Sequence, residues 1–514
     1  MNRRQFITTA AAGVTGLAIA GSRSFAQKNK RPNILFAISD DQSWPHAGIY
    51  GAKFVKTPAF DRIAGEGVLF NNVFCAAPQC SPDRASILTG RHIWQNQEAG
   101  THASNFPRSL QVFTDILEKT GYQLGYTGKP WGPGNWEITG WPRNPVGPEY
   151  NEIRYKKPPQ PGINVINYAA NFERFLAHRE PGKPFFFWYG AKEPHRSYMK
   201  GCGLKKGKSV DDVTVPKFLP DHPEIRSDLL DYAVEIEWFD KHLQDMIRVL
   251  EEQGELDNTV IVVTSDNGMP FPRAKANLYE YGIHMPFAVR WGNGISGGRR
   301  ADDLISFIDI APTFLDIANA PVPADMRGQS FLNVLKSNKS GLIDASRNQV
   351  FSGRERHTHA RPNNFGYPAR SIRTADYLYI WNIKPDRWPA GDPTGSGDPE
   401  GYHDIDACPS KTFIIENRQK YPRLAALSLD KRPEEELYDI QNDPGCMTNL
   451  ADQPDMQHIK EELASVLKKE LHDTGDPRVL GFGDVWESYP RYSRMRKFAG
   501  FKKRGEYNPE FRQK

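Results

Sequence analysis

The chain has 514 residues, of which 39% are hydrophobic and 25% charged, a composition typical of an ordinary globular protein. This length can enclose more than one hydrophobic core, so we expect one large domain and a smaller one. The formal charge of +4 excludes a strongly basic nucleic-acid-binding protein, and beyond the N-terminus no segment is apolar enough to span a membrane.

Residues 1–26 have the pattern of an export signal. Arg3 and Arg4 precede a weakly apolar run over residues 8–21, and residues 24–26 supply a small-residue cleavage site, which is typical of a twin-arginine signal peptide. A membrane anchor fits less well, because the run is short and interrupted by Gly and Thr. We therefore predict a periplasmic or secreted protein whose formal charge after cleavage is +1.

Three short apolar runs predict buried strands that lead into polar clusters. They cover residues 33–38, 184–189 and 260–264, and a helical pattern occupies residues 226–253. Strands alternating with helices indicate an α/β fold with a mostly parallel sheet covered on both faces. Ligands of such sheets bind beyond the carboxyl ends of the strands, where all three polar clusters are expected.

The pattern changes after about residue 345. Residues 377–381 and 436–440 predict short strands among Pro- and Gly-rich loops, and residues 456–472 predict a helix. We interpret this part as a smaller α+β domain. The predicted organisation is a signal over 1–26, a large α/β domain over 27–345 and a smaller C-terminal domain and tail over 346–514.

The most specific motif begins at Cys80. Residues 80–90 read Cys-Ser-Pro-Asp-Arg-Ala-Ser-Ile-Leu-Thr-Gly and fit the pattern Cys-x-Pro-x-Arg-x-x-x-x-Thr-Gly. A single Cys is often only a buried small side chain or a reactive thiol, but five fixed positions make chance agreement unlikely. The motif resembles the signature of the type I sulfatases, in which this Cys is oxidised to formylglycine.

The resemblance to sulfatases extends over most of the chain. Further segments similar to the family lie at residues 57–64, 265–268 and 308–313. Segments similar to the heparan N-sulfatase (sulfamidase)-like members are 193–196, 266–272, 369–371 and 436–439. The resemblance implies an alkaline-phosphatase-like fold and a sulfuric ester or sulfamide hydrolase, with a formylglycine-generating enzyme as a partner during maturation.

Two pairs of polar residues follow predicted strands, namely Asp40 with Asp41 and Asp266 with Asn267. Each pair alone could simply cap a strand or form a turn. Together their oxygen atoms and three negative charges suit a hard divalent cation, Ca²⁺ before Mg²⁺. We therefore predict that these four residues are metal ligands.

The resemblance also implies a mechanism. Hydrated formylglycine at position 80 would attack sulfur, while the cation and three basic residues, Arg84, Lys129 and Lys275, neutralise the sulfuryl oxygens. His195 would protonate the leaving oxygen or nitrogen. Without the family context each of these side chains would be interpreted as a surface charge, an ion-pair partner or an ordinary loop residue.

One position departs from the family pattern. Sulfatases carry Lys-x-His after Gly-Tyr-x-x-Gly, and here Trp131 stands where the His is expected. An indole donates one hydrogen bond but cannot take up a proton. Either His102 or His92 replaces the missing group, or turnover depends on the metal-bound carboxylates. A further alternative is that the protein, with Trp131 at this position, is weakly active or inactive.

Substrate contacts are expected from loops around the site and at the start of the second domain. The candidates are His102, Arg354, His357, His359 and Arg370. The first expected substrate is N-sulfoglucosamine of heparan-type saccharides. Alternatives are an O-sulfatase acting on algal or animal polysaccharide, a phosphodiesterase or phosphonate hydrolase of the same superfamily, and a glycan-binding protein that has lost catalysis.

Overall fold

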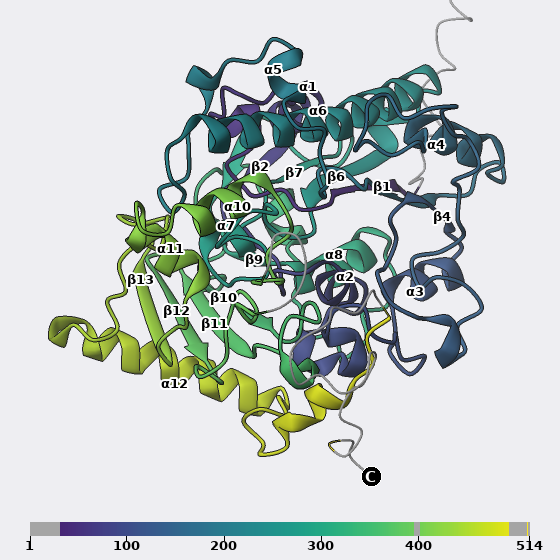
Figure 1. Ribbon diagram of the computed structural model, residues 1–514. Coiled ribbons are helices and arrows are strands. Elements are labelled where there is room, and N and C mark those ends of the chain that lie inside the picture. The colour runs from purple at the N-terminus through teal and green to yellow at the C-terminus, as the bar shows by residue number, and fades with distance from the viewer. Residues whose placement is uncertain (1–30, 395–400, 493–510, 512–514) are drawn as a thin grey trace, which may run out of the picture.

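The computed structural model describes residues 31–394, 401–492 and 511, so the export signal predicted for residues 1–26 lies outside the described part. Within it, the main sheet has seven strands (Figure 1). Their spatial order is β4 (Gln123–Gly128), β5 (Phe185–Gly190), β1 (Asn33–Ser39), β6 (Thr259–Ser265), β7 (Phe287–Arg290), β2 (Val68–Phe70) and β8 (Arg299–Ala301). β7 runs antiparallel to β6 and β2, and the other neighbours pair in parallel, which confirms the predicted mostly parallel sheet.

Helices cover both faces of this sheet. On one side lie α1 (Pro58–Glu66), α4 (Tyr168–Ala177) and α6 (Pro223–Glu252); on the other lie α2 (Cys80–Thr89), α3 (Phe113–Lys119) and α8 (Ile310–Ile317) (Figure 1). Alternation along β1 explains the two layers, since successive strand side chains point to opposite faces. Leu35 packs in the core that contains residues of α6, and Phe36 in the core that contains residues of α8.

The long helix α6 covers the helical pattern predicted at residues 226–253 except for its last residue, which is the C-cap. It starts with Pro223 after the N-cap His222, whose side chain accepts a hydrogen bond from the backbone of Glu224, and Pro suits the first turn because it lacks an N–H group. Leu229, Ala233 and Ile236 are among its fully buried residues, and their spacing places them on one helix face.

The second sheet is antiparallel and has four strands within the described residues: β10 (Gln349–Arg354), β11 (Ala369–Thr374), β12 (Tyr377–Asn382) and β13 (Glu435–Asp439). The helix α12 (Gln457–Asp473) lies along it (Figure 1), where Leu463 and Leu467 pack in one cluster with Ile372 and Leu437. The remaining strands and α-helices of the described part are β3 (Val73–Phe74), β9 (Ile305–Ser306), α5 (Cys202–Lys205), α7 (Glu280–Ile283), α9 (Leu332–Lys336), α10 (Pro409–Glu416) and α11 (Pro422–Leu429), and short 3-10 helices lie between them. The C-terminal part therefore has the α+β character expected from the sequence.

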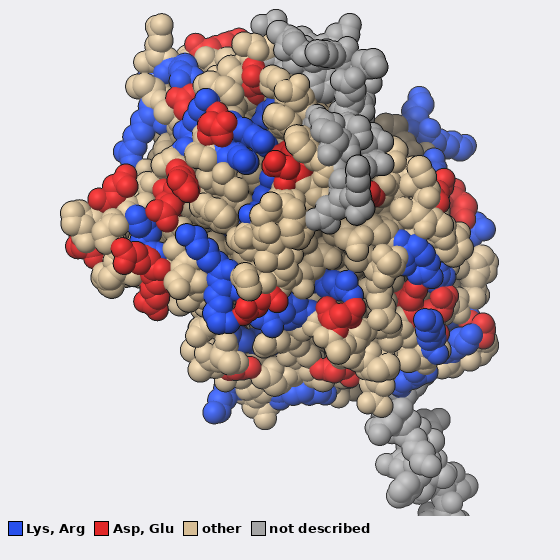
Figure 2. Space-filling view, turned by 90° about the horizontal axis from the view of Figure 1, so that it is seen from below, with Lys and Arg blue, Asp and Glu red and all other residues tan. Residues whose placement is uncertain are grey.

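The surface carries both signs of charge. On the face shown in Figure 2, Lys and Arg are interspersed with Asp and Glu, without a continuous field of one sign. Among the described residues, no helix combines the length and the apolar character needed to cross a membrane. All five cysteines of the chain lie in the described part, and each is buried and free of disulfide bonds.

Candidate active site

The two polar pairs predicted from the sequence meet at one edge of the main sheet. β1 and β6 are parallel neighbours, with Ser39 opposite Ser265, so the residues that follow each strand lie side by side. The backbone N–H of Asp41 donates to Oδ1 of Asp266 at 3.1 Å, and Nδ2 of Asn267 donates to Oδ1 of Asp41 at 2.7 Å. The carboxyl ends of these two central strands therefore position the four predicted metal ligands.

Cys80 is the first residue of α2 and faces the same cluster. Its Sγ lies 3.3 Å from Oδ1 of Asp40 and 3.9 Å from Oδ1 of Asp41. The side chain is buried, and burial followed by the charge of Asp40 raises the pKa of the thiol well above its ordinary value. A neutral thiol is a poor nucleophile, so the unmodified Cys80 is unsuited to act as a thiolate here.

Arg84 lies one helical turn after Cys80, on the same face of α2. Its Nε donates to Oδ2 of Asp266 at 2.8 Å, and its Nη1 donates to the carbonyl oxygen of Lys129 at 2.8 Å. The guanidinium is completely buried, and its Nη2 makes no hydrogen bond with the residues that the structure describes. Arg84 thus fixes the cluster and keeps one donor for an oxyanion.

Two lysines bring positive charge to the carboxylates. Nζ of Lys129, which follows β4, lies 2.7 and 2.6 Å from the two carboxylate oxygens of Asp40, and Nζ of Lys275 lies 2.6 Å from Oδ2 of Asp41. Burial opposes the charged form of each lysine, but Asp40 raises the pKa of Lys129, and two neighbouring carboxylates raise that of Lys275. Both side chains are therefore ammonium ions at neutral pH.

His195 lies in the loop after β5, at the rim of the cluster. Its Nδ1 is 2.6 Å from the carbonyl oxygen of Arg196, which can only accept, so Nδ1 carries the hydrogen. The other ring nitrogen, Nε2, lies 3.9 Å from Oδ2 of Asp41, and 37% of the side chain is exposed. His195 can therefore present Nε2 to a bound molecule.

Asp406 is a member of this cluster that the sequence analysis missed. It comes from the loop before α10, and its Oδ2 lies 3.2 Å from Nζ of Lys275. Burial would raise its pKa, but Lys275 and then His195 hold the pKa of Asp406 well below its usual range. No local signal marks it, because a single Asp in a loop carries no motif and follows no predicted strand of the main sheet.

The donors of the cluster fit a hard cation. Ligand atoms of Asp40, Asp41, Cys80 and Asp266 lie within 4.8 Å of one another. Oδ1 of Asn267 is buried and has no hydrogen-bond partner in the described part of the chain, which leaves this oxygen for a ligand bond. Carboxylate and amide oxygens are the donors that Ca²⁺ takes.

Trp131 has a packing role. It is buried, its Nε1 donates to the carbonyl oxygen of Ser81 at 3.0 Å, and its ring packs edge-on against Phe106. The indole therefore supports the first turn of α2, directly behind Cys80, from a position where the sequence pattern leads one to expect a His.

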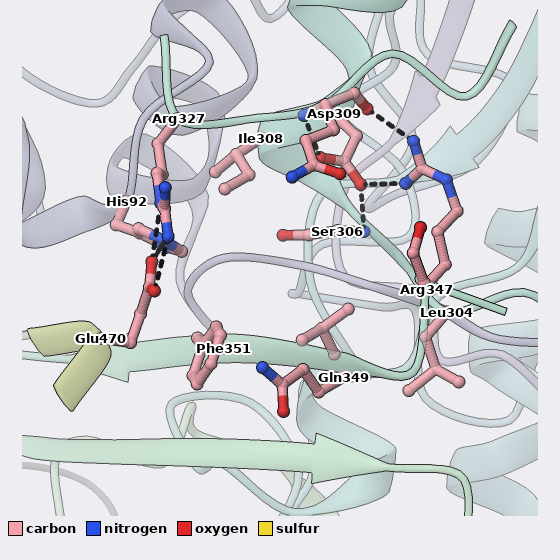
Figure 3. A pocket seen from close by; sticks show the side chains of 13 residues that line it. His92, Leu304, Ser306, Ile308, Asp309, Arg327, Arg347, Gln349, Phe351 and Glu470 are labelled. Atoms are coloured by element: carbon pink, nitrogen blue, oxygen red, sulfur yellow. Dashed lines mark hydrogen bonds and ion pairs between the residues drawn. The ribbon is translucent and has the colours of Figure 1, made fainter. Parts of the chain in front are cut away.

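His92 and His102, the two candidates to replace the family His at position 131, lie in different parts of the structure. His92 belongs to a separate pocket, where its Nε2 is 3.2 Å from Glu470 (Figure 3), so the suggestion that His92 replaces the family His is wrong. Nδ1 of His102 donates to the carbonyl oxygen of His357 at 3.0 Å. Burial and then the charge of His357 lower the pKa of His102 well below its usual value, and Lys275 contributes.

The other predicted substrate contacts are buried within the protein. Arg354 is buried with its Nη2 2.9 Å from Asp404, whereas Nδ1 of the buried His357 lies 3.7 Å from the same carboxylate and makes no hydrogen bond with the described residues. His359 is buried with its Nδ1 against Asn364. These contacts hold the end of β10 and the loop that follows it, and they do not support direct sugar binding by Arg354 or His359.

Arg370 is fully buried on β11. Its Nε donates to Asp476 at 2.7 Å and its Nη2 to Glu355 at 2.8 Å, while its Nη1 donates to backbone carbonyls. All of its donor nitrogens are thus engaged inside the protein. Its assignment as a substrate ligand stays a prediction that this geometry does not support.

Comparisons with known proteins identify the family of this chain. A family model described as Sulfatase matches residues 32–320, and one described as N-sulphoglucosamine sulphohydrolase, C-terminal, matches residues 273–420. An ulvan-active sulfatase of Formosa agariphila is 29% identical over 87% of this chain and 81% of its own. The human N-sulphoglucosamine sulphohydrolase is 26% identical over 88% of this chain and 93% of its own.

Solved structures show the same fold. The structure of BT4656 in complex with its substrate D-glucosamine-2-N,6-O-disulfate superposes with a TM-score of 0.63 and 22% identity, covering 87% of this chain and 99% of the other. The alkaline-phosphatase-like fold expected from the sequence is thereby confirmed. With the Sulfatase model matching more than half of its length, the chain belongs to the sulfatase family and is a hydrolase of sulfuric esters or sulfamides.

Proposed function

We propose that this enzyme is an exported sulfatase that removes the N-sulfate of glucosamine from heparan-type saccharides. The observation that carries the proposal is the position of Cys80, at the start of α2 and 3.3 Å from Asp40, inside a cluster of carboxylates, lysines and Arg84. The choice of N-sulfate is supported by the match to the N-sulphoglucosamine sulphohydrolase C-terminal model and by the similarity to the human enzyme of that name.

We propose that Cys80 is converted to formylglycine by a formylglycine-generating enzyme. Its hydrated aldehyde supplies an oxygen nucleophile, which the buried neutral thiol does not. The ion proposed is Ca²⁺, with Mg²⁺ less suited, held by Asp40, Asp41, Asp266 and Asn267. Bound there, it supplies a positive charge for the sulfuryl oxygens.

The side chains around position 80 bind and neutralise the sulfate group. Arg84 offers its Nη2, which lies 3.9 Å from Oδ1 of Asp40 and makes no hydrogen bond with the described residues. Lys129 and Lys275 carry ammonium groups at the carboxylates of Asp40 and Asp41. Preorganised positive charges stabilise a transition state in which negative charge spreads over the sulfuryl oxygens.

His195 is the proposed general acid. Its Nδ1–H is held by the carbonyl oxygen of Arg196, so a proton on Nε2 faces the site and can pass to the leaving atom. The exposed fraction of the side chain, 37%, lets the ring exchange that proton with solvent after each turnover.

We also propose the division of the chain. Residues 1–26 would be a twin-arginine signal, 27–345 the catalytic domain and 346–514 the smaller domain and tail. Asp406 reaches the cluster from the second domain, so both domains would contribute to the site.

Sulfate release from defined saccharides tests the function. Calcium-loaded protein, whose Cys80 peptide has been checked by mass for formylglycine, is incubated with N-sulfoglucosamine and with O-sulfated glucosamines. Release from N-sulfoglucosamine, abolished in Cys80→Ala and retained in the control Cys75→Ala, is the expected result. No release from any sugar despite a converted Cys80 would favour a phosphodiesterase or a glycan-binding protein.

A second candidate function is an O-sulfatase acting on algal or animal polysaccharide. The similarity to an ulvan-active sulfatase at 29% identity favours it. The same cluster serves this reaction, because the nucleophile and cations act on the sulfuryl group and not on the atom that links it to the sugar. Release only from O-sulfated substrates would establish this alternative and reject the N-sulfate assignment.

A further inference from the structure

Asp406 places a carboxylate beside the general acid of the site. Its Oδ2 is 3.2 Å from Nζ of Lys275, and ligand atoms of Asp406, His195 and Asp41 lie within 4.8 Å of one another. The Asp406 side chain is 25% exposed, although its Oδ2 is buried and makes no hydrogen bond with the described residues. A group bound to Nε2 of His195 therefore lies within reach of Asp406.

The cations of the cluster are not equivalent in their surroundings. Lys129 and Arg84 contact Asp40 and Asp266, the predicted metal ligands. Lys275 instead bridges Asp41 and Asp406, and only Asp41 belongs to the ligand set. The carboxylate of Asp406 thus has a cation that holds it in place, but it has no part in the roles assigned so far.

We propose that Asp406 selects a sulfamate over a sulfate ester by accepting a hydrogen bond from the leaving nitrogen. The proposal rests on the proposed function, because it uses His195 as the acid at the leaving atom. A sulfamate nitrogen carries one N–H and can donate to a carboxylate. The corresponding oxygen of a sulfate ester carries no hydrogen. It cannot donate to Asp406, and the two acceptor oxygens repel each other, so binding of the ester is disfavoured.

The preference of Asp406 for a sulfamate over a sulfate ester grows as the S–N bond breaks. The sulfuryl group passes to the oxygen nucleophile at position 80, which gives up its proton to a neighbouring carboxylate of the cluster, and the electron pair of the S–N bond passes to nitrogen. Nitrogen takes the proton of Nε2 of His195 and leaves as an amine with two N–H groups. A further proton from water converts the amine into an ammonium ion, which a carboxylate binds more strongly still.

Two matched substrates test this role. N-sulfoglucosamine and glucose 2-sulfate present the sulfuryl group at the same ring position and differ in the linking N–H or oxygen. The kcat/KM values are measured for wild type, for Asp406→Asn, which keeps the size but removes the charge, and for the control Asp455→Asn, which alters an exposed carboxylate outside the cluster. Thermal unfolding checks that each variant is folded.

We expect Asp406→Asn to lower kcat/KM for N-sulfoglucosamine by about 10–100-fold, the range for a lost hydrogen bond to a charged group. Activity on glucose 2-sulfate stays the same or rises, and Asp455→Asn changes neither value. The product glucosamine inhibits the wild type more strongly than glucose does, and this difference disappears in Asp406→Asn.

Three outcomes would overturn the proposal. An equal fall on both substrates means that Asp406 acts only by holding Lys275. If the wild type hydrolyses N-sulfoglucosamine and Asp406→Asn leaves both kcat/KM values unchanged, the role of Asp406 is rejected and the proposed function stays intact. A wild type without activity on N-sulfoglucosamine rejects the N-sulfate assignment together with this role.

Discussion

Arg84 and Asp266 form a fully buried ion pair, with Nε of the guanidinium 2.8 Å from Oδ2 of the carboxylate. The same guanidinium donates to the carbonyl oxygens of Lys129 and Pro130, so it connects α2, the end of β6 and the loop after β4. Burial and the charge of Asp40 raise the pKa of Asp266 to about 6, while Arg84 opposes that rise. The side chain of Arg84 therefore stabilises the site and contributes to its charge.

Replacing Arg84 with Ala should damage both stability and activity. Loss of one partner leaves a buried charge unpaired, which costs about 3–5 kcal/mol, and loss of an oxyanion donor lowers kcat about 100–1,000-fold. Urea unfolding and sulfate-release rates measure the two effects. The control Arg62→Ala removes exposed pairs with Glu66 and Glu251 and should cost no more than about 1 kcal/mol. An Arg84→Ala variant with wild-type kcat would contradict the assignment.

Removal of divalent cations should lower the melting temperature and the activity. Calcium at about 100 times its Kd adds about 2.7 kcal/mol to the free energy of unfolding, and we expect Ca²⁺ to restore both properties better than Mg²⁺. Asn267→Ala should raise the calcium concentration needed, because it deletes a neutral oxygen ligand. The control Asn338→Ala, at an exposed side chain, should behave as wild type. Calorimetric titration of chelator-treated protein measures the affinity, and equal affinities in the two variants would exclude Asn267 as a ligand.

Trp131→Phe should reduce stability more than catalysis. The substitution keeps most of the aromatic packing against Phe106 but removes the donor to the carbonyl oxygen of Ser81. An unsatisfied buried acceptor costs about 1–3 kcal/mol, so the melting temperature should fall while kcat stays within about tenfold of wild type. If kcat instead fell far more steeply than stability, the indole would take part in turnover directly.

Glu235 on α6 should make the stability depend on pH. Burial and then the charge of Glu193 raise the pKa of Glu235 from 4.5 to about 8. Between these values the folded state keeps a proton that the unfolded state releases, so the free energy of unfolding falls as pH rises through this window.

Glu235→Gln removes that dependence. The variant should match wild type near pH 4.5 and exceed it by an amount on the order of a few kcal/mol above pH 8, since one pKa unit corresponds to about 1.4 kcal/mol. Urea unfolding at a series of pH values provides the comparison, with Glu252→Gln, at the exposed end of α6, as the control. Parallel pH curves for Glu235→Gln and wild type would show that Glu235 is ionised in the folded protein.

Much of the site could be predicted because its parts are local in sequence. Asp40 with Asp41 and Asp266 with Asn267 each follow directly after a buried strand, and parallel strands bring their carboxyl ends to one edge. Cys80 and Arg84 are separated by one helical turn, so their common orientation follows from helix geometry alone. The strands over 33–38 and 260–264 and the helix over 226–253 were recognisable for the same reason.

Only the tertiary structure decided which partners the other charged side chains have. Arg370 pairs with Asp476, 106 residues away, and His92 with Glu470, 378 residues away, so neither joins the site. Asp406, an unremarkable Asp in its loop, reaches Lys275 through the packing of the second sheet and its helices against the first. The physical reason is the same in each case: a charged side chain is stabilised by whichever opposite charge the fold brings within a few ångströms, and sequence spacing contains no information on that distance.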